Sequence, residues 1–421
     1  MGRLRSLKRL AHDAVDATVE IVREGHDSGA RAVRRVTDEI DGVREAAEAI
    51  DGVRRVTTAG VLGAVKGVNR LVEVVTEAGL DAALGEEGFS DTHAPVAMRS
   101  DACGGAWWAD AALGALNGAV GDHLGPRHDA LDLAMRLRVG ERYVDPTPEA
   151  LAAALPEATA RLVVFVHGLG TTEWSWALKS QEYYGAPDVT FASQLTRDLD
   201  ATCVFVRYNT GRHVSEGGAA LCALLERLVA GYPAPLSSLV LVGHSMGGLV
   251  CRSACHEAER TGAAWADALT DAFYLGSPHR GAPLAKLGHA LARGLSALDL
   301  PATRVIGKVL EGRSAGVKDL RHGALVDEEW DASQPLLDRD ALPLPHARHA
   351  FISGAVTEDA DHVATRLIGD LLVRVPSAAG PEWRCETFDI DATHCGGVLH
   401  HELQNHPAVY AHIRRLLSGG V

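Results

Sequence analysis

Residues 238–251 read SLVLVGHSMGGLVC, and this stretch decides how the rest of the chain is interpreted. The apolar run at residues 239–242 is typical of a buried strand, and the apolar residues after the second glycine can continue as a helix. Between them lies the G-x-S-x-G pattern of a sharp strand-to-helix turn that exposes a serine hydroxyl. Small residues at Gly243 and Gly247 let two backbones pass close together there. We therefore predict that Ser245 is a nucleophile, which requires a base and backbone N–H donors nearby.

Strand-like runs recur on both sides of this stretch, at spacings that leave room for a helix between them. They lie at residues 134–139, 161–167, 202–208, 271–275, 350–353 and 383–389. Helical patterns separate them, for example at residues 216–230. Because parallel strands need such crossover connections, we predict an α/β fold with a doubly wound, mainly parallel sheet over residues 106–421.

The segment FVHGLG at residues 165–170 directly follows one predicted strand. A tetrahedral intermediate needs two N–H donors aimed at its developing negative charge. One should be the N–H of Met246, directly after the nucleophile, and the other that of Leu169 in this segment. His167 precedes Ser245 in the chain, so we expect it to support the loop rather than to act as the base.

The expected order of a triad on such a sheet is serine, acid and then histidine. Asp370 lies in RLIGDLLVRVPS at residues 366–377, where a Gly-Asp step before an apolar run suits a loop that presents a carboxylate. Glu358, Asp359 and Asp361 lie closer to the end of the preceding predicted strand and compete for this role. We favour Asp370, with Asp359 or Asp361 next.

The base should lie on the loop after the last strand, where its ring can reach the serine. Four histidines qualify by position: His394, His400, His401 and His406. The last of them directly precedes Pro407, which is typical of the start of a helix. Position alone leaves the choice among the others open.

Taken together, these pieces resemble the α/β-hydrolase superfamily, and within it the bacterial lipase and esterase families related to the GPI inositol-deacylase group. The resemblance covers roughly residues 107–417. The matching pieces are HGLG at 167–170, GHSMGG at 243–248, LGSPHRGAP at 275–283, GDLLVRVPSA at 369–378 and HHELQNHPAVY at 400–410. It implies a serine hydrolase that cleaves lipid-like or small carboxylic esters through a Ser-His-Asp triad, with no cofactor. Thioesterase, amidase and acyltransferase activities share this machinery, and a non-catalytic scaffold on the same fold is the alternative from another class.

The resemblance also narrows the choice of acid and base. In similar lipases a Gly-Asp-Gly-Leu-Val-Pro segment carries the acid, which corresponds to Asp370, although Leu371 and Arg374 depart from that pattern. Their histidine heads an H-x-x-L-L-x-x-P pattern, which corresponds to His400, and His401 is the alternative. The implied triad is therefore Ser245, Asp370 and His400.

Two further parts of the chain have patterns of their own. Residues 1–80 carry valine- and alanine-rich stripes at helical spacing, which predict an amphipathic bundle or hairpin, followed by a linker at 81–105. This part could dock on the hydrolase domain, self-associate into a homo-oligomer, or contact a lipid surface peripherally. Residues 284–330 hold glycine-punctuated helical segments, which we interpret as a cap over the site, either a mobile lid or a static excursion.

Composition excludes several classes of partner. The net charge of −14 argues against nucleic acid, and no run of 18 apolar residues is present to cross a membrane. The seven cysteines are scattered, which favours reduced thiols and a cytoplasmic protein. Cys251, Cys255 and His256 are close in sequence but have no second ligand pair, so we expect no metal.

Overall fold

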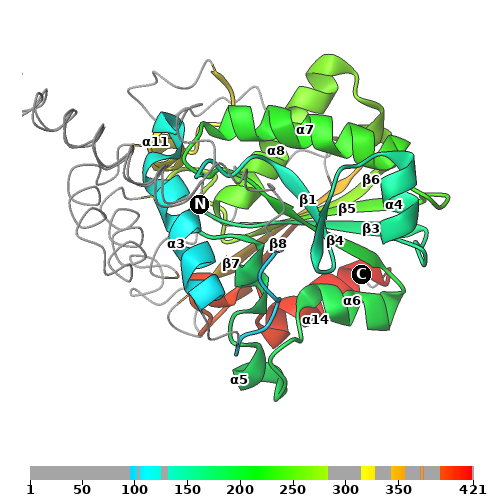
Figure 1. Cartoon of the computed structure of the whole chain (residues 1–421), viewed down its shortest axis with the longest axis horizontal. Helices are drawn as coiled ribbons and strands as arrows, with labels where there is room; N and C mark the ends of the chain where they lie inside the picture. The colour runs from blue at the N-terminus through cyan, green and yellow to red at the C-terminus, as the bar shows by residue number, and fades with distance from the viewer. Residues whose placement is uncertain are drawn as a thin grey trace, which may run out of the picture. The chain divides into compact units, whose positions relative to one another are not determined.

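The computed structural model describes residues 95–101, 105–124, 131–282, 314–327, 343–355, 370, 373 and 389–419 (Figure 1). The chain divides into two compact units, Met1–Asp91 with Gly125–Leu131, and Thr92–Leu124 with Asp132–Val421. All elements considered below belong to the second unit. The helices predicted over residues 1–80, most of the predicted linker and the alternative acids Glu358, Asp359 and Asp361 lie outside the described residues.

Within the described residues, eight strands form one sheet in the order β2-β1-β4-β3-β5-β6-β7-β8. The strands are β1 (Arg136–Val139), β2 (Arg142–Val144), β3 (Arg161–Val166), β4 (Thr202–Arg207), β5 (Ser238–His244), β6 (Leu269–Leu275), β7 (Arg348–Gly354) and β8 (Asp389–Cys395). From β4 to β8 all neighbours are parallel, whereas β1 is antiparallel to both β2 and β4. The predicted doubly wound, mainly parallel sheet is confirmed.

Helices cover both faces of this sheet (Figure 1). One face packs against α4 (Pro148–Ala154), α7 (Val214–Ala230) and α8 (Met246–Thr261), and the other against α6 (Phe191–Leu199) and α14 (Pro407–Leu417). A hydrophobic core lies on each face of the sheet, and alternate residues of β3 contribute to one core or the other. Leu162 and Val164 belong to the first core, and Val163 and Phe165 belong to the second. Because both faces are buried, this strand is a continuous apolar run rather than an alternating one.

Two strands differ from the prediction. β2 was not predicted, because three residues after a turn at Gly140 carry too little pattern to be recognised as a strand. A final strand was predicted over residues 383–389, of which only Asp389 lies within the described residues; from there β8 runs to Cys395, beyond the predicted end, and pairs in parallel with β7. His394 therefore lies on a strand and not on the loop that follows it.

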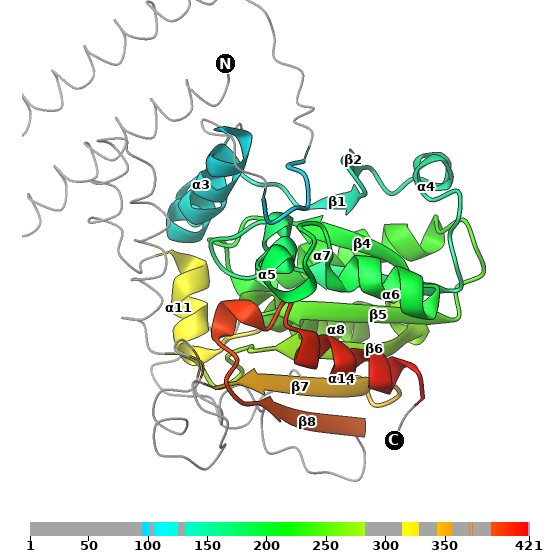
Figure 2. The same cartoon turned by 90° about the horizontal axis from the view of Figure 1, so that it is seen from below.

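The described part of the predicted cap is a short helix, α11 (Ala315–His322), with its flanking residues. Figure 2 shows α11 beside α3 (Gly105–Val120). The Ser314 hydroxyl donates to the Gly118 carbonyl at 2.8 Å, and the Gly316 N–H donates to the Gly211 carbonyl at 3.0 Å. These two hydrogen bonds fix α11 against α3 and the loop after β4, while the role of residues 284–330 as a cap stays a prediction. Among the described residues, no helix combines the length and apolarity needed to cross a membrane.

Candidate active site

The turn between β5 and α8 holds Ser245 in a conformation that side chains rarely adopt, with φ 53° and ψ −121°. The Ser245 N–H donates to the Leu275 carbonyl at 2.8 Å, and its own carbonyl accepts from Gly248 N–H at 3.1 Å. These bonds tie the turn to β6 on one side and to the first turn of α8 on the other. A strained, well-supported turn at this place is a feature of functional sites rather than of ordinary connections.

Glycines at this turn are required by space. A Cβ on Gly247 would lie 2.3 Å from the Val166 carbonyl oxygen and 2.5 Å from that of His167. A Cβ on Gly243 would lie 2.6 Å from the Cα of Gly248. The loop after β3 and the start of α8 therefore approach each other more closely than any side chain would allow.

His400 and Asp370 form a buried pair. The His400 Nδ1–H donates to Asp370 Oδ2 at 2.7 Å, and both side chains are nearly inaccessible to solvent. The other carboxylate oxygen accepts from the Val373 N–H at 2.8 Å. The His400 N–H also donates to the Asp370 carbonyl at 3.1 Å. The carboxylate thus fixes both the orientation and the tautomer of the ring, which leaves Nε2 as the nitrogen able to accept a proton.

His244, the residue before Ser245, connects the turn to this pair. His244 Nε2–H donates to the His400 carbonyl at 2.9 Å, and the two ring centroids are 4.9 Å apart. A Cβ on Gly276, just after β6, would lie 3.2 Å from His400 Nδ1 and 3.3 Å from Asp370 Oδ2. Ser245, His400 and Asp370 therefore lie together where β5, β6 and β7 end.

The loop after β3 lies directly against Ser245. A Cβ on Gly168 would be 3.1 Å from the Cβ of Ser245. Gly170 N–H is already engaged by the Thr210 hydroxyl at 3.0 Å, so Leu169 supplies the candidate donor in this loop. Met246 is the first residue of α8, and its N–H precedes the first hydrogen bond within the helix. Leu169 follows Gly168, which lies against Ser245, and Met246 directly follows Ser245 in the chain, while the role of their N–H groups as oxyanion donors stays a prediction.

The sequence of this domain matches a known protein family. A family model described as the alpha/beta hydrolase family matches residues 163–413, which is more than half of the chain. The chain belongs to this family. None of the curated proteins matches this hydrolase in sequence.

Solved structures that this chain resembles include lipases and esterases. The mature form of the Bacillus licheniformis lipase BlEst2 has a TM-score of 0.42 and 17% identity, covering 61% of this chain and 92% of that one. The Pyrococcus furiosus esterase Pf2001 has a TM-score of 0.36 and 12% identity, covering 62% of this chain and 83% of that one. A lipase-esterase related protein from Clostridium acetobutylicum ATCC 824 has a TM-score of 0.34 and 14% identity, covering 63% and 96% respectively.

The other histidines considered from the sequence occupy different positions in the hydrolase. His401 is exposed, and His394 on β8 hydrogen-bonds the Ser353 hydroxyl at 3.2 Å. His406 Nδ1 accepts from the Ala408 N–H and caps α14, as its place before a proline predicts. Among these described histidines, His400 is the one that the structure pairs with Asp370.

His167 supports the loop that carries Leu169. Its Nδ1–H donates to the Gly168 carbonyl at 3.1 Å, its Nε2 accepts from the Tyr208 N–H, and its ring stacks on Tyr208 with centroids 4.6 Å apart. Burial lowers the pKa of His167 to about 4, which keeps the ring neutral and both hydrogen bonds in place near neutral pH. This geometry agrees with the supporting role expected from the sequence.

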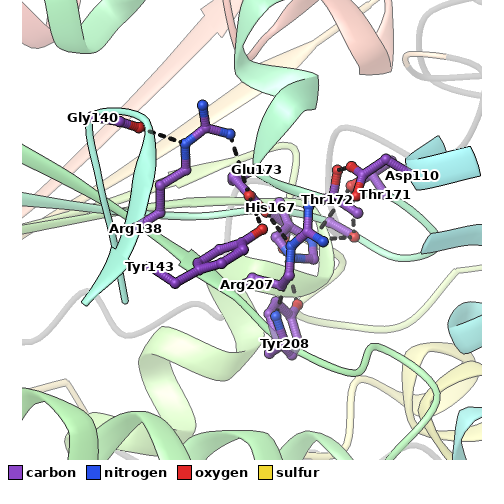
Figure 3. A network of polar contacts seen from close by, with 11 residues as sticks. Asp110, Arg138, Gly140, Tyr143, His167, Thr171, Thr172, Glu173, Arg207 and Tyr208 are labelled. Atoms are coloured by element: carbon purple, nitrogen blue, oxygen red, sulfur yellow. Dashed lines mark hydrogen bonds and ion pairs between the residues drawn. The ribbon is translucent and has the colours of Figure 1, made fainter. Parts of the chain in front are cut away.

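A buried ionic network beyond this loop was not foreseen from the sequence (Figure 3). Its centre is Glu173, the first residue of the 3-10 helix η3 (Glu173–Ala177), which is completely buried. Its carboxylate contacts Arg207 Nε at 2.8 Å, the Tyr143 hydroxyl at 2.7 Å and Arg138 Nη1 at 3.3 Å. Burial alone would raise the pKa of Glu173, but the two guanidinium groups outweigh it and hold that pKa at about 2.

The network continues to α3 and anchors the loop at its far end. Asp110 pairs with Arg207 Nη2 at 2.7 Å and accepts from the Thr172 hydroxyl at 2.6 Å (Figure 3). Two arginines thus balance two carboxylates inside the protein, as buried charges require. The sequence signal was weak: a glutamate between Thr172 and Trp174 has no recognisable partner until the strand order is known.

The described residues contain no gathering of three or more histidine, cysteine, aspartate or glutamate side chains that could hold a metal ion. Cys251 and Cys255 lie on the buried side of α8, within the core that it forms with α7. Burial raises the pKa of the Cys255 thiol to about 12, so it stays protonated. Packing accounts for both cysteines.

Proposed function

We propose that this protein is a serine hydrolase that cleaves carboxylic esters through Ser245, His400 and Asp370. The observation that carries the proposal is the buried His400–Asp370 pair. The backbone carbonyl of His400 also accepts a hydrogen bond from the side chain of His244, the residue just before Ser245. A nucleophile, an oriented base and two flanking N–H groups are what acyl transfer through an acyl-enzyme needs.

In the proposed reaction His400 Nε2 takes the proton of Ser245 Oγ as that oxygen attacks the acyl carbonyl carbon. Asp370 stabilises the imidazolium that forms, and the N–H groups of Leu169 and Met246 receive the oxyanion. When the tetrahedral intermediate collapses, the ester C–O bond breaks and His400 returns the proton to the departing alcohol. Water then attacks the acyl-enzyme with the same base, which releases the acid and restores Ser245. The chemistry of these residues needs no cofactor, and the substrate is a lipid-like or short acyl ester.

The first experiment compares the protein with Ser245→Ala on p-nitrophenyl esters of several acyl lengths. We expect hydrolysis by the unchanged protein, a loss of at least about 10⁴-fold in kcat in the variant, and covalent labelling by a fluorophosphonate only when the serine is present. Hydrolysis and labelling absent from both proteins would contradict the proposal and leave a non-catalytic scaffold. Thioester or amide analogues in the same assay separate the related acyl-transfer activities.

A second experiment assigns the base. His400→Ala should lower kcat by about 10⁴-fold or more, whereas His401→Ala should retain most of it, because only the first ring is bonded to Asp370. The exposed neighbour serves as the matched control, since the two changes remove the same side chain one residue apart. The reverse outcome would move the base to His401.

A further inference from the structure

The loop that carries the proposed base, residues 399–405, packs on the segment that continues from the oxyanion loop, residues 173–190. We call the first the base loop and the second the support segment. The base loop contains the 3-10 helix η6 (His400–Glu402), with His400 as its first residue. Two side chains of the base loop, Glu402 and Asn405, bridge to the support segment.

Glu402 uses its two carboxylate oxygens for different partners. Oε2 accepts from the Leu399 N–H at 2.8 Å, directly before His400. Oε1 contacts Lys179 Nζ at 2.6 Å, and the Glu402 side chain is only 10% exposed. Burial by itself would raise the pKa of Glu402, but the Lys179 and Leu399 contacts outweigh it and lower that pKa. The ionised carboxylate thus joins the peptide next to the base to the support segment.

Lys179 adopts a backbone conformation that favours glycine. Its φ is 57° and its ψ 14°, just before α5 (Ser180–Tyr184), and a side chain in this region costs on the order of 1 kcal/mol. Its ammonium lies over the Tyr183 ring, 5.6 Å from the centroid. A second carboxylate, Glu182, lies 3.4 Å away but is 62% exposed, so its screened contact is the weaker of the two. Lys179 thus makes these side-chain contacts from a backbone conformation that glycine would adopt at lower cost.

Asn405 holds the far end of the base loop. Its side-chain amide donates to the backbone carbonyls of Leu178 and Val189, both at 3.1 Å. The backbone carbonyl of Asn405 accepts from the Tyr184 hydroxyl at 2.8 Å. The support segment begins at Glu173 in the buried ionic network. The oxyanion loop and the base loop are therefore both attached to one anchored stretch of chain.

We propose that the Lys179–Glu402 ion pair positions His400 relative to Ser245, so that both are positioning residues for the base. This inference rests on the proposed function of Ser245 and His400. An ion pair that fixes the peptide before the base limits how far the imidazole can drift from the serine. Misplacement by about 1 Å can cost on the order of a hundredfold in rate, so a contact that touches no substrate can still control kcat.

The test compares Glu402→Gln, Glu402→Ala and Lys179→Met with the control Glu182→Gln, which removes the charge of the other carboxylate beside the same lysine. For p-nitrophenyl butyrate, we expect kcat to fall by between about ten- and a hundredfold in Glu402→Ala, with KM within about twofold of the unchanged protein. Glu402→Gln should keep part of the rate, because an amide oxygen can still accept from the Leu399 N–H. Lys179→Met should also lower kcat, and Glu182→Gln should not.

Proton NMR provides a readout besides turnover, through the low-field resonance of the His400 Nδ1–H. The resonance is assigned by its loss in Asp370→Asn. We expect it to broaden or shift in both Glu402 variants while the melting temperature stays close to that of Glu182→Gln. Unchanged kcat and an unchanged proton signal in Glu402→Ala would overturn the proposal. A fall in kcat would also overturn it if the fraction of enzyme that reacts with a fluorophosphonate fell by the same factor. If the unchanged protein neither hydrolyses esters nor reacts with a fluorophosphonate, the proposed function fails, while the proton signal still decides whether the ion pair positions His400.

Discussion

At Ser245 the chain stores backbone strain where it also presents a hydroxyl. A positive φ on a residue with a Cβ costs free energy, and the surrounding hydrogen bonds to Leu275 and Gly248 hold it in place. Such strain is tolerated when the side chain has a use that glycine could not serve. The stability of variants at this position therefore separates the cost of the conformation from the contribution of the hydroxyl.

Both Ser245→Ala and Ser245→Gly remove the hydroxyl, but only glycine relaxes the backbone. We expect Ser245→Gly to unfold with a free energy about 1 kcal/mol higher than that of Ser245→Ala, measured by urea titration. Ser253, inside α8, offers a control in ordinary helical conformation. There the order should reverse, with Ser253→Gly about 1 kcal/mol less stable than Ser253→Ala. Equal stabilities of the two Ser245 variants would contradict the assignment of strain.

At the scale of elements, the network around Glu173 joins η3 to β1, β2, β4 and α3. Glu173 lies 34 positions from Arg207 and 35 positions from Arg138 in the chain. The two arginines meet it because β1 and β4 are neighbours in the sheet. Glu173 lies four residues after Leu169, the proposed oxyanion donor in the loop after β3. We therefore expect a loss of this network to disturb the loop beside Ser245 as well.

Breaking this network at its centre should be costly. Glu173→Gln leaves two buried guanidinium groups with one carboxylate, and we expect it to lower the free energy of unfolding by about 3 kcal/mol or more. Asp145→Asn is the matched change at an exposed ion pair, with Arg227, where both side chains are more than half exposed. It should leave the urea midpoint nearly unchanged. Similar effects of the two substitutions would show that burial does not distinguish these ion pairs.

At the scale of the whole molecule, three buried histidines predict how stability depends on pH. Burial lowers the pKa of His244 to about 3 and those of His167 and His349 to about 4. The unfolded chain, with ordinary histidine pKa values near 6.5, binds more protons than the folded protein below that pH. Stability is therefore fully present above about pH 6.5 and is lost as the pH falls towards 4.

We expect the free energy of unfolding to fall between about pH 7 and pH 4.5, by on the order of 2 kcal/mol for each of these histidines. Burial raises the pKa of Asp319, which opposes this loss at the acid end. Urea titrations across this range measure the slope. His349→Gln should reduce it, whereas His123→Gln, at an exposed position, should leave it unchanged. A stability that stays constant or rises on acidification would contradict the prediction.

Much of the fold and of the candidate site could be predicted from the sequence, because both rest on local patterns. Residues 238–251 contain the apolar run before Ser245, the glycines around it and the start of the helix after it. Because these features are neighbours in the chain, they can be recognised without a structure. The same holds for Leu169 and Met246, whose places beside a strand end and beside Ser245 follow from adjacency in the chain. The parallel sheet followed from the spacing of strands and helices.

Other features depended on the tertiary structure, because they join residues far apart in the chain. Position left several histidines and carboxylates open, and only the packing of β7, β8 and the loop beyond them brings His400, rather than the exposed His401, to Asp370. The pairing of β8 with β7 and the partners of Glu173 likewise follow from strand order. Sequence patterns specify which segments can form strands, turns and helices, whereas the pairing of buried charges is decided by which of those segments become neighbours.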